Sequence, residues 1–122
     1  MLTRKTQRQR SNDWHDYYSR QALERANVNG NKPFVYVGMG LEPERAWNDK
    51  SHKYDGPIIG QGVWVVQNVD GFKQNPIKVI VETDSISGLN FGKSVQFQGL
   101  LGYFSRKNYS YSFRADGIKV LD

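Results

Sequence analysis

Flat aromatic rings and basic side chains lie close together at three points of this sequence, and these residue types could bind single-stranded nucleic acid. Unpaired bases stack on such rings, each stack contributing about 1–3 kcal/mol, while cations follow the phosphates. We expect this chemistry in three loop groups and at one strand arginine: Trp47, Lys50, Lys53 and Tyr54; Phe72 and Lys73; Arg106, Lys107 and Tyr109; and Arg114.

Alternation near the C-terminus leaves two interpretations open. Tyr109, Tyr111 and Phe113 share one face of an expected strand, either as core or as a stacking surface. Arg114 shares the opposite, polar face, which is directed to nucleic acid or to water. Trp64 lies among valines and is predicted to be core. Lys78 is interpreted as a strand-end charge that keeps an edge soluble.

Positive charge is concentrated in the first part of the chain. Residues 1–32 carry seven basic and three acidic side chains, a net charge of +4 out of +5 for the whole sequence. The first ten residues contain no acid, so we expect an extended arm that binds nucleic acid or a neighbouring subunit. The alternative is a solvated tail. The arm's basic residues are Arg4, Lys5, Arg8 and Arg10.

Groups for catalysis are scarce. The sequence has no cysteine, and its two histidines, His15 and His52, show no metal-binding or triad spacing. Glu82, Asp84 and Asp116 form only a weak pattern for a magnesium site. We therefore expect a protein that is not an enzyme and has no cofactor or metal.

One short helix is predicted before residue 32. Ser11, Asn12 and Asp13 are candidate caps, the helix runs to Arg25, and Asn27 to Pro33 end it. Its aromatic stripe needs a cover, either the domain's own sheet or a neighbouring subunit. The stripe is therefore also a candidate oligomerisation surface, and its residues are Trp14, Tyr17 and Tyr18.

Beyond Pro33, short runs rich in Val, Ile, Tyr and Phe alternate with turn residues, which is typical of an all-β domain. Turns are expected at Asn68–Gly71 and Ser105–Asn108. Glu42–Pro57 is expected to be a long loop with a helical turn at Pro43–Trp47. Five strands are predicted, near residues 34–41, 58–67, 77–82, 93–104 and 109–121.

Five strands in about 90 residues favour a small barrel, because closure hides strand edges. Glycines 60, 62, 99 and 102 and the Ala115–Gly117 step would supply its bends. We predict an all-β, five-stranded oligonucleotide-binding-like barrel at residues 33–122, preceded by the basic arm and short helix at 1–32. No membrane-length apolar run or signal core is visible, which indicates a cytoplasmic protein.

The second half of the chain also resembles a known family. The segments Pro76–Val81, Leu89–Gly92 with Val95–Phe97, and Tyr109–Ile118 resemble small proteins of Gram-positive conjugative plasmids and integrative elements. Those proteins resemble single-strand-binding modules and helicase processivity factors. The resemblance covers residues 58–121 and implies DNA binding.

These observations together predict a sequence-independent single-stranded DNA-binding protein of a mobile element, a plasmid or a phage. RNA and duplex DNA are expected to bind more weakly. The arm would join protomers into a homo-oligomer along the strand. The alternative is a non-catalytic protein-interaction or structural module of a phage or secretion machine.

Overall fold

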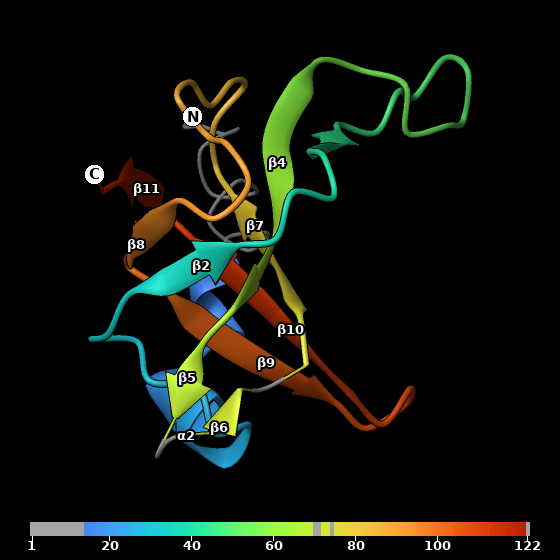
Figure 1. The fold of residues 1–122 in the computed structure, drawn as a ribbon. Coiled ribbons are helices and arrows are strands. Elements are labelled where there is room, and N and C mark those ends of the chain that lie inside the picture. Colours follow the sequence, from blue (N-terminus) through green and yellow to red (C-terminus); the bar gives the residue numbers. More distant parts are fainter. Residues whose placement is uncertain (1–13, 70–71, 74, 122) are drawn as a thin grey trace.

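The all-β expectation is confirmed. The computed structural model describes residues 14–69, 72–73 and 75–121, with 44% strand and 9% helix (Figure 1). The basic arm and the candidate caps Ser11, Asn12 and Asp13 lie outside the described residues.

Within the described residues, one sheet holds eight strands, and two further strands form a small separate hairpin. The sheet path runs β11-β8-β2-β4-β7-β10-β9, and β3 pairs with β4 beside this path. β7 and β10 are parallel, and the other pairs are antiparallel. The sheet strands are β2 (Phe34–Tyr36), β3 (Glu42–Arg45), β4 (Ile58–Val66), β7 (Ile77–Val81), β8 (Ser94–Gln98), β9 (Leu101–Ser105), β10 (Ser110–Ala115) and β11 (Gly117–Val120); the hairpin comprises β5 (Asn68–Val69) and β6 (Phe72–Lys73).

The expected five-stranded barrel is not confirmed, because the sheet is not closed. The predicted fourth strand is divided into β8 and β9, and the fifth into β10 and β11. Gly99 lies at the first break, between β8 and β9. Its φ of 66° is in the left-handed region, which is unfavourable for residues with a side chain. Asp116 lies at the second, where its amide donates to the Gln98 carbonyl at 2.7 Å. The bend expected at residues 115–117 is therefore present.

The predicted helical turn at Pro43–Trp47 is wrong. Residues 42–45 form β3, which pairs with the first half of β4, from Glu42 opposite Gly62 to Arg45 opposite Ile58. The register shifts between Glu44 and Arg45. Tertiary pairing outweighs local propensity here, because β4 is long enough to pair with β3 along its first half and with β2 along its second.

The core lies under one face of the central strands. Val63 and Val65 of β4 are fully buried, as are Val79 and Val81 of β7. Since successive side chains of a strand point to opposite faces, Trp64 and Lys78 must point away from these valines. The prediction of Trp64 as core is therefore wrong.

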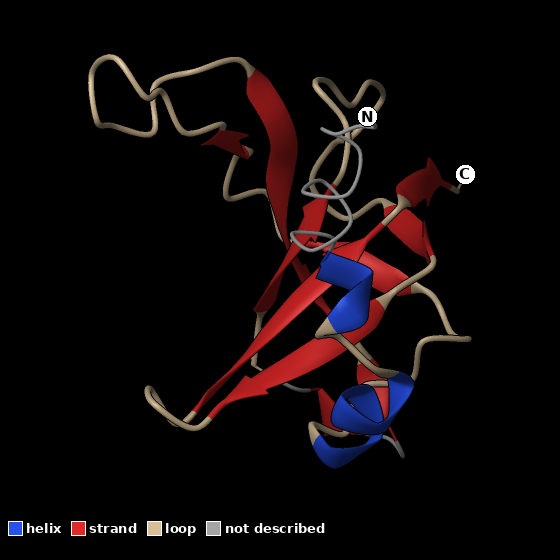
Figure 2. Cartoon of the chain, turned by 180° about the vertical axis from the view of Figure 1, so that it is seen from behind, coloured by secondary structure: helices blue, strands red, loops and turns tan. Residues whose placement is uncertain are grey.

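The predicted single helix is divided. Trp14–Asp16 is a 3-10 turn, and the α-helix α2 covers only Arg20–Arg25. Ser19 caps α2, its hydroxyl accepting from the Ala22 amide at 3.2 Å, and it bridges the backbone of Gly102 in β9. Leu23 packs in the same buried cluster as the sheet valines, so α2 covers the end of that core (Figure 2).

Candidate nucleic-acid interface

A row of aromatic rings runs along the β9–β10 hairpin. Tyr111 lies opposite Phe104 in the register, and their ring centroids are 4.9 Å apart. Phe104 also meets Tyr109 at 6.2 Å, and Tyr111 is stacked with Phe113 at 6.4 Å. We call these four rings the hairpin ladder; it leads from the solvent-exposed tip to the buried Phe113.

Tyr111 and Phe113 lie in β10, as expected, but Tyr109 lies in the turn before it and does not begin the strand. Phe113 is 6% exposed and belongs to the core, whereas Tyr109 is 85% exposed. Tyr109 also has φ of 51°, a left-handed conformation that is uncommon for a bulky residue. A residue that combines a strained backbone with a solvent-exposed ring is a candidate for contact with a ligand.

Two cations lie at the tip of this hairpin. Arg106 and Lys107 are exposed, and among the described residues neither forms an ion pair. The turn contains no acidic residue, and the Asn108 amide donates to the Ser105 hydroxyl at 3.3 Å to close it. The tip therefore combines positive charge with an exposed ring, as the sequence predicted.

A groove opens beside the ladder because β7 and β10 separate. Their pairing extends only over Val79–Val81 with Phe113–Ala115, so Tyr111 and Ser112 lie beyond it. The groove has a volume of 410 Å³, and Trp64, Lys78 and Ile80 line it together with Tyr111 and Ser112. Its walls thus combine aromatic rings with one cation.

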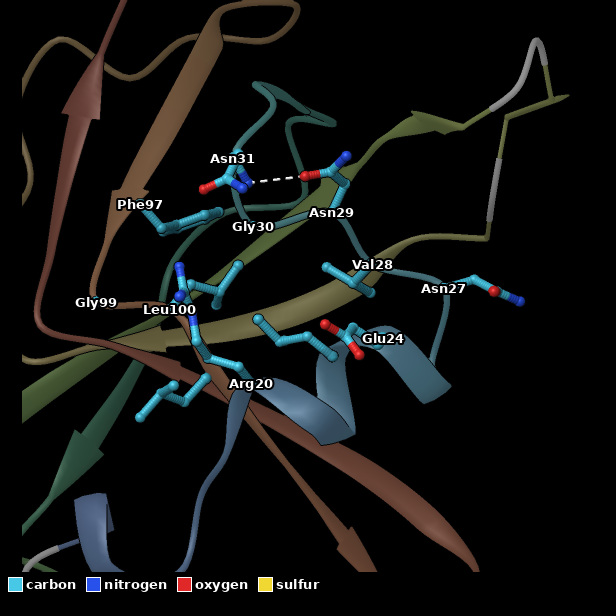
Figure 3. Close-up of a pocket in the computed structure, with 12 residues that line it drawn as sticks. Arg20, Glu24, Asn27, Val28, Asn29, Gly30, Asn31, Phe97, Gly99 and Leu100 are labelled. Carbon is cyan, nitrogen blue, oxygen red and sulfur yellow. Dashed lines mark hydrogen bonds between the residues drawn. The ribbon is translucent and has the colours of Figure 1, made fainter.

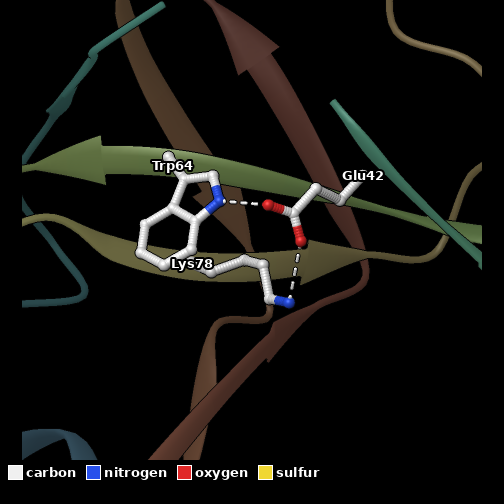
Figure 4. A network of polar contacts seen from close by, with 3 residues as sticks. All are labelled: Glu42, Trp64 and Lys78. Carbon is white, nitrogen blue, oxygen red and sulfur yellow. Dashed lines mark hydrogen bonds and ion pairs between the residues drawn. The ribbon is translucent and has the colours of Figure 1, made fainter. Parts of the chain in front are cut away.

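The outer face of β3, β4 and β7 carries a polar network at this groove (Figure 4). The Glu42 carboxylate accepts from the Trp64 indole at 2.7 Å and from the Lys78 ammonium at 3.1 Å. These hydrogen bonds, that of Trp64 first, lower the pKa of Glu42. Lys78, interpreted from the sequence as a strand-end charge, is thus an ion-pair partner within β7.

Predicted residues of the long loop form a second, separate group. Trp47 and Tyr54 meet edge to face at 5.0 Å and are 49% and 72% exposed. Lys50 and Lys53 are exposed beside them, but Asp49 and Asp55 offset their charge. A backbone bridge between Asn48 and Lys53 orders this loop.

The loop and the hairpin tip lie far apart. In Figures 1 and 2 the loop of residues 46–57 projects from one end of the molecule and the β9–β10 tip from the other. The predicted groups are therefore not brought into one cluster. Phe72 and Lys73 belong to β6, at the end that holds α2, and their side chains lie outside the described part. Arg4, Lys5, Arg8 and Arg10 also lie outside it.

Arg114 has a structural partner. Its guanidinium donates to both Glu44 carboxylate oxygens, at 2.7 and 3.0 Å, and lies 5.8 Å from the Trp14 ring. Only 14% of the Arg114 side chain is exposed, and although burial opposes its charge, the bonds to Glu44 raise its pKa. This ion pair connects β10 to β3. We therefore assign Arg114 a structural role and do not count it among the cations that are free to bind a ligand.

The aromatic stripe near the N-terminus packs on the chain's own sheet. Tyr18 lies 5.5 Å from Tyr103 of β9 and 5.3 Å from Trp14, and burial raises its pKa. His15 stacks on Trp14 and contacts the Asp116 carboxylate at 2.7 Å. The sequence left open whether the domain's own sheet or a neighbouring subunit covers this stripe. For Trp14 and Tyr18, the cover is the domain's own sheet. Tyr17 is 61% exposed.

A larger cavity lies elsewhere, between α2, the turn after it and the β8–β9 bend (Figure 3). It has a volume of 770 Å³, with Leu23, Val28 and Phe97 as apolar lining and Arg20 and Glu24 as charged lining. None of the binding or oligomerisation residues predicted from the sequence lines this cavity. No sequence motif marked it, because it is assembled from separated segments.

Sequence reasoning also missed Phe104 and Glu42. Part of the signal for Phe104 was available, because a turn at Ser105–Asn108 places it opposite Tyr109; the observed turn lies one residue later and pairs Phe104 with Tyr111. Glu42 had no such signal, since β3 itself was not predicted. Within the described ranges, no three His, Asp or Glu side chains gather as metal ligands, and no helix has the length and apolarity to cross a bilayer.

No protein-family model, curated protein or solved structure matches this chain.

Proposed function

We propose that this protein binds single-stranded DNA without sequence preference and is not an enzyme. The observation that carries the proposal is the hairpin ladder, with an exposed Tyr109 at a tip whose two cations lack ion-pair partners among the described residues. Bases would stack on Tyr109 and continue toward Phe104 and Tyr111, while Arg106 and Lys107 hold phosphates. Every base has a flat face, so such stacking tolerates any sequence.

The groove beside the ladder extends this path. A strand leaving Tyr111 would enter the space next to Ser112, Lys78 and Trp64. The outer face of β4 and β7 then serves as the continuation of the binding surface, and the Trp47–Tyr54 pair would bind a more distant part of a long strand. Single-stranded chains are flexible enough to connect such separated contacts.

Strand order supports a coiled sheet of the oligonucleotide-binding type. One end of the sheet path is β11-β8 and the other is β10-β9. β8 and β9 are the two halves of one bent chain segment, and β10 and β11 are the two halves of another. A sheet whose ends are halves of the same bent strands must curl toward closure. Oligonucleotide-binding folds are partly open barrels of this kind.

The biological setting belongs to the proposal as well. The resemblance at residues 58–121 favours a mobile element, and a cytoplasmic location is part of the proposal. The basic arm would add affinity or join neighbouring subunits into a homo-oligomer. RNA and duplex DNA are proposed as weaker ligands; for the duplex the reason is that its bases are paired and cannot stack on the ladder.

A protein-interaction or structural module of a phage or secretion machine is the second candidate. Phe91 and Met39 favour it, with 79% and 61% of their surfaces exposed. Phe91 lies against the backbone of Gly38, so the two loops that carry these residues are neighbours. Exposed apolar side chains that lie together can mark a protein contact.

The variant Arg106→Gln/Lys107→Gln tests the proposed site. Loss of two phosphate contacts should reduce the slope of log K against log salt by about 1.4 for a single strand. Affinity should fall for all homopolymers alike, because these charges read no bases. Fluorescence anisotropy of labelled oligothymidine at several salt concentrations measures both quantities.

The matched control is Lys32→Gln/Lys119→Gln, which removes the same charge from exposed positions away from the tip. It should change the slope much less than the tip variant does. Equal behaviour of the two variants would show that net charge, and not the tip, governs binding.

A further inference from the structure

We propose that Trp64 and Lys78 form a binding site for a phosphate group, that Glu42 occupies this site in the free protein, and that a phosphodiester of the bound strand displaces it. The inference deepens the proposed function and rests on it for the identity of the ligand. It adds a site that was not expected from the sequence.

Two donors from neighbouring strands converge on one anion. Trp64 and Lys78 are directly opposite in the β4–β7 register, and the indole nitrogen and the ammonium reach separate oxygens of Glu42, at 2.7 and 3.1 Å. A phosphodiester also presents two unesterified oxygens with shared negative charge. The pair of donors that holds the carboxylate can therefore hold a phosphate in the same way.

Gly62 makes this convergence possible. A Cβ at Gly62 would lie 2.9 Å from Cδ of Lys78 and 3.2 Å from its Cγ. Because Gly62 has no side chain, the Lys78 stem can lie across β4 and bring its ammonium to Glu42, which is opposite Gly62 in β3. The ammonium is thereby also held 6.0 Å from the Trp64 ring.

Exchange of Glu42 for a ligand is feasible because the contact is accessible. The side chains of Lys78 and Glu42 are 38% and 50% exposed, and ion pairs this open contribute little net stability. Trp64 and Lys78 both line the groove that continues the hairpin ladder. A strand lying in that groove would bring its phosphates beside the two donors, where Glu42 competes with them.

The variant Glu42→Gln provides the test. Glutamine keeps an oxygen for the Trp64 indole but removes the competing charge, so oligothymidine affinity should rise about three- to tenfold at low salt. Glu24→Gln, which makes the same charge change on α2, should raise affinity less than twofold. In a Lys78→Gln background, Glu42→Gln should give no gain. Urea unfolding of each variant confirms that it is folded.

An equal effect of Glu42→Gln and Glu24→Gln, or a gain that persists without Lys78, would overturn the phosphate site. A second measurement uses inorganic pyrophosphate as the probe. In Glu42→Gln the indole N–H resonance of Trp64 should move on addition of pyrophosphate, and in Glu42→Gln/Lys78→Gln it should stay in place. Absence of movement in both variants also counts against the site.

Failure of the proposed function would look different. If oligothymidine binds neither wild type nor Glu42→Gln while pyrophosphate moves the Trp64 resonance, the anion site exists and single-strand binding is wrong. If oligothymidine binds through the tip, and neither oligothymidine nor pyrophosphate moves the Trp64 resonance, the proposed function is supported and the phosphate site is wrong.

Discussion

Tyr109 combines two properties that stability alone does not favour. Its backbone is left-handed, which costs an L-residue about 1–2 kcal/mol, and its ring is mostly in water. The edge contact with Phe104 is the one ring contact recorded for it within the described residues. We infer that this side chain is placed for a ligand, so its effects on stability and on binding should separate.

Tyr109→Gly should separate them. Glycine adopts the left-handed conformation freely, so the midpoint of urea unfolding should stay the same or rise. Affinity for oligothymidine should fall roughly tenfold or more, because one stacking ring is lost. A fall in stability with affinity unchanged would show that Tyr109 supports the hairpin and does not bind the strand.

At the level of single residues, sequence reasoning was informative where the pattern is local. The tip charges and the exposure of Tyr109 follow from a hairpin turn flanked by alternating rings. Trp64 was misassigned because it lies among valines, although the alternation of those valines places it on the opposite face. Arg114 could not be assigned without Glu44, since its partner lies in a strand that the sequence did not reveal.

At the level of elements, the bends decide how the sheet is arranged. Gly99 divides β8 from β9, and a Cβ placed there would collide with the Asp116 side chain at the second division. Both bends are therefore packed together at one place. This junction lets the same chain segments contribute to both ends of the sheet path.

Gly99→Ala should destabilise the fold by at least about 1–2 kcal/mol, the cost of a side chain in the left-handed region. Gly88→Ala is the matched control, because Gly88 also has positive φ but open space around its Cβ position. Gly99→Ala should lower the free energy of unfolding more than the control does. Equal losses in urea titrations would show that the contact with Asp116 has no role at the bend.

Element types were predictable where short runs rich in Val and Ile stand between turn residues, as in residues 58–66 and 77–81. Bends at Gly99 and at Ala115–Gly117 were expected, but not that each divides one strand into two, because this depends on the backbone conformation of Gly99 and on the hydrogen bond from Asp116 to Gln98. β3 was not predicted, because Glu42–Arg45 is charged and contains a proline, and it forms a strand only by pairing with β4. The short helix was also misplaced, because its true cap, Ser19, is fixed by a bridge to Gly102.

For the whole molecule, the sequence indicated the all-β class but not the distribution of sites. The loop of residues 46–57 and the hairpin tip project from opposite ends, so a strand touching both must cross the sheet between them (Figure 1). The groove and the Trp64–Lys78 donors lie on the outer side of the core strands. Such an arrangement favours an extended ligand over a compact one.

The most direct test of single-strand binding by the hairpin is a titration of the isotopically labelled protein with oligothymidine, followed by NMR at low salt. We predict that the amide resonances of residues 103–112 move most and that those lining the α2 cavity remain in place. Absence of any movement, or movement confined to residues 20–31 and 97–101, would contradict the account.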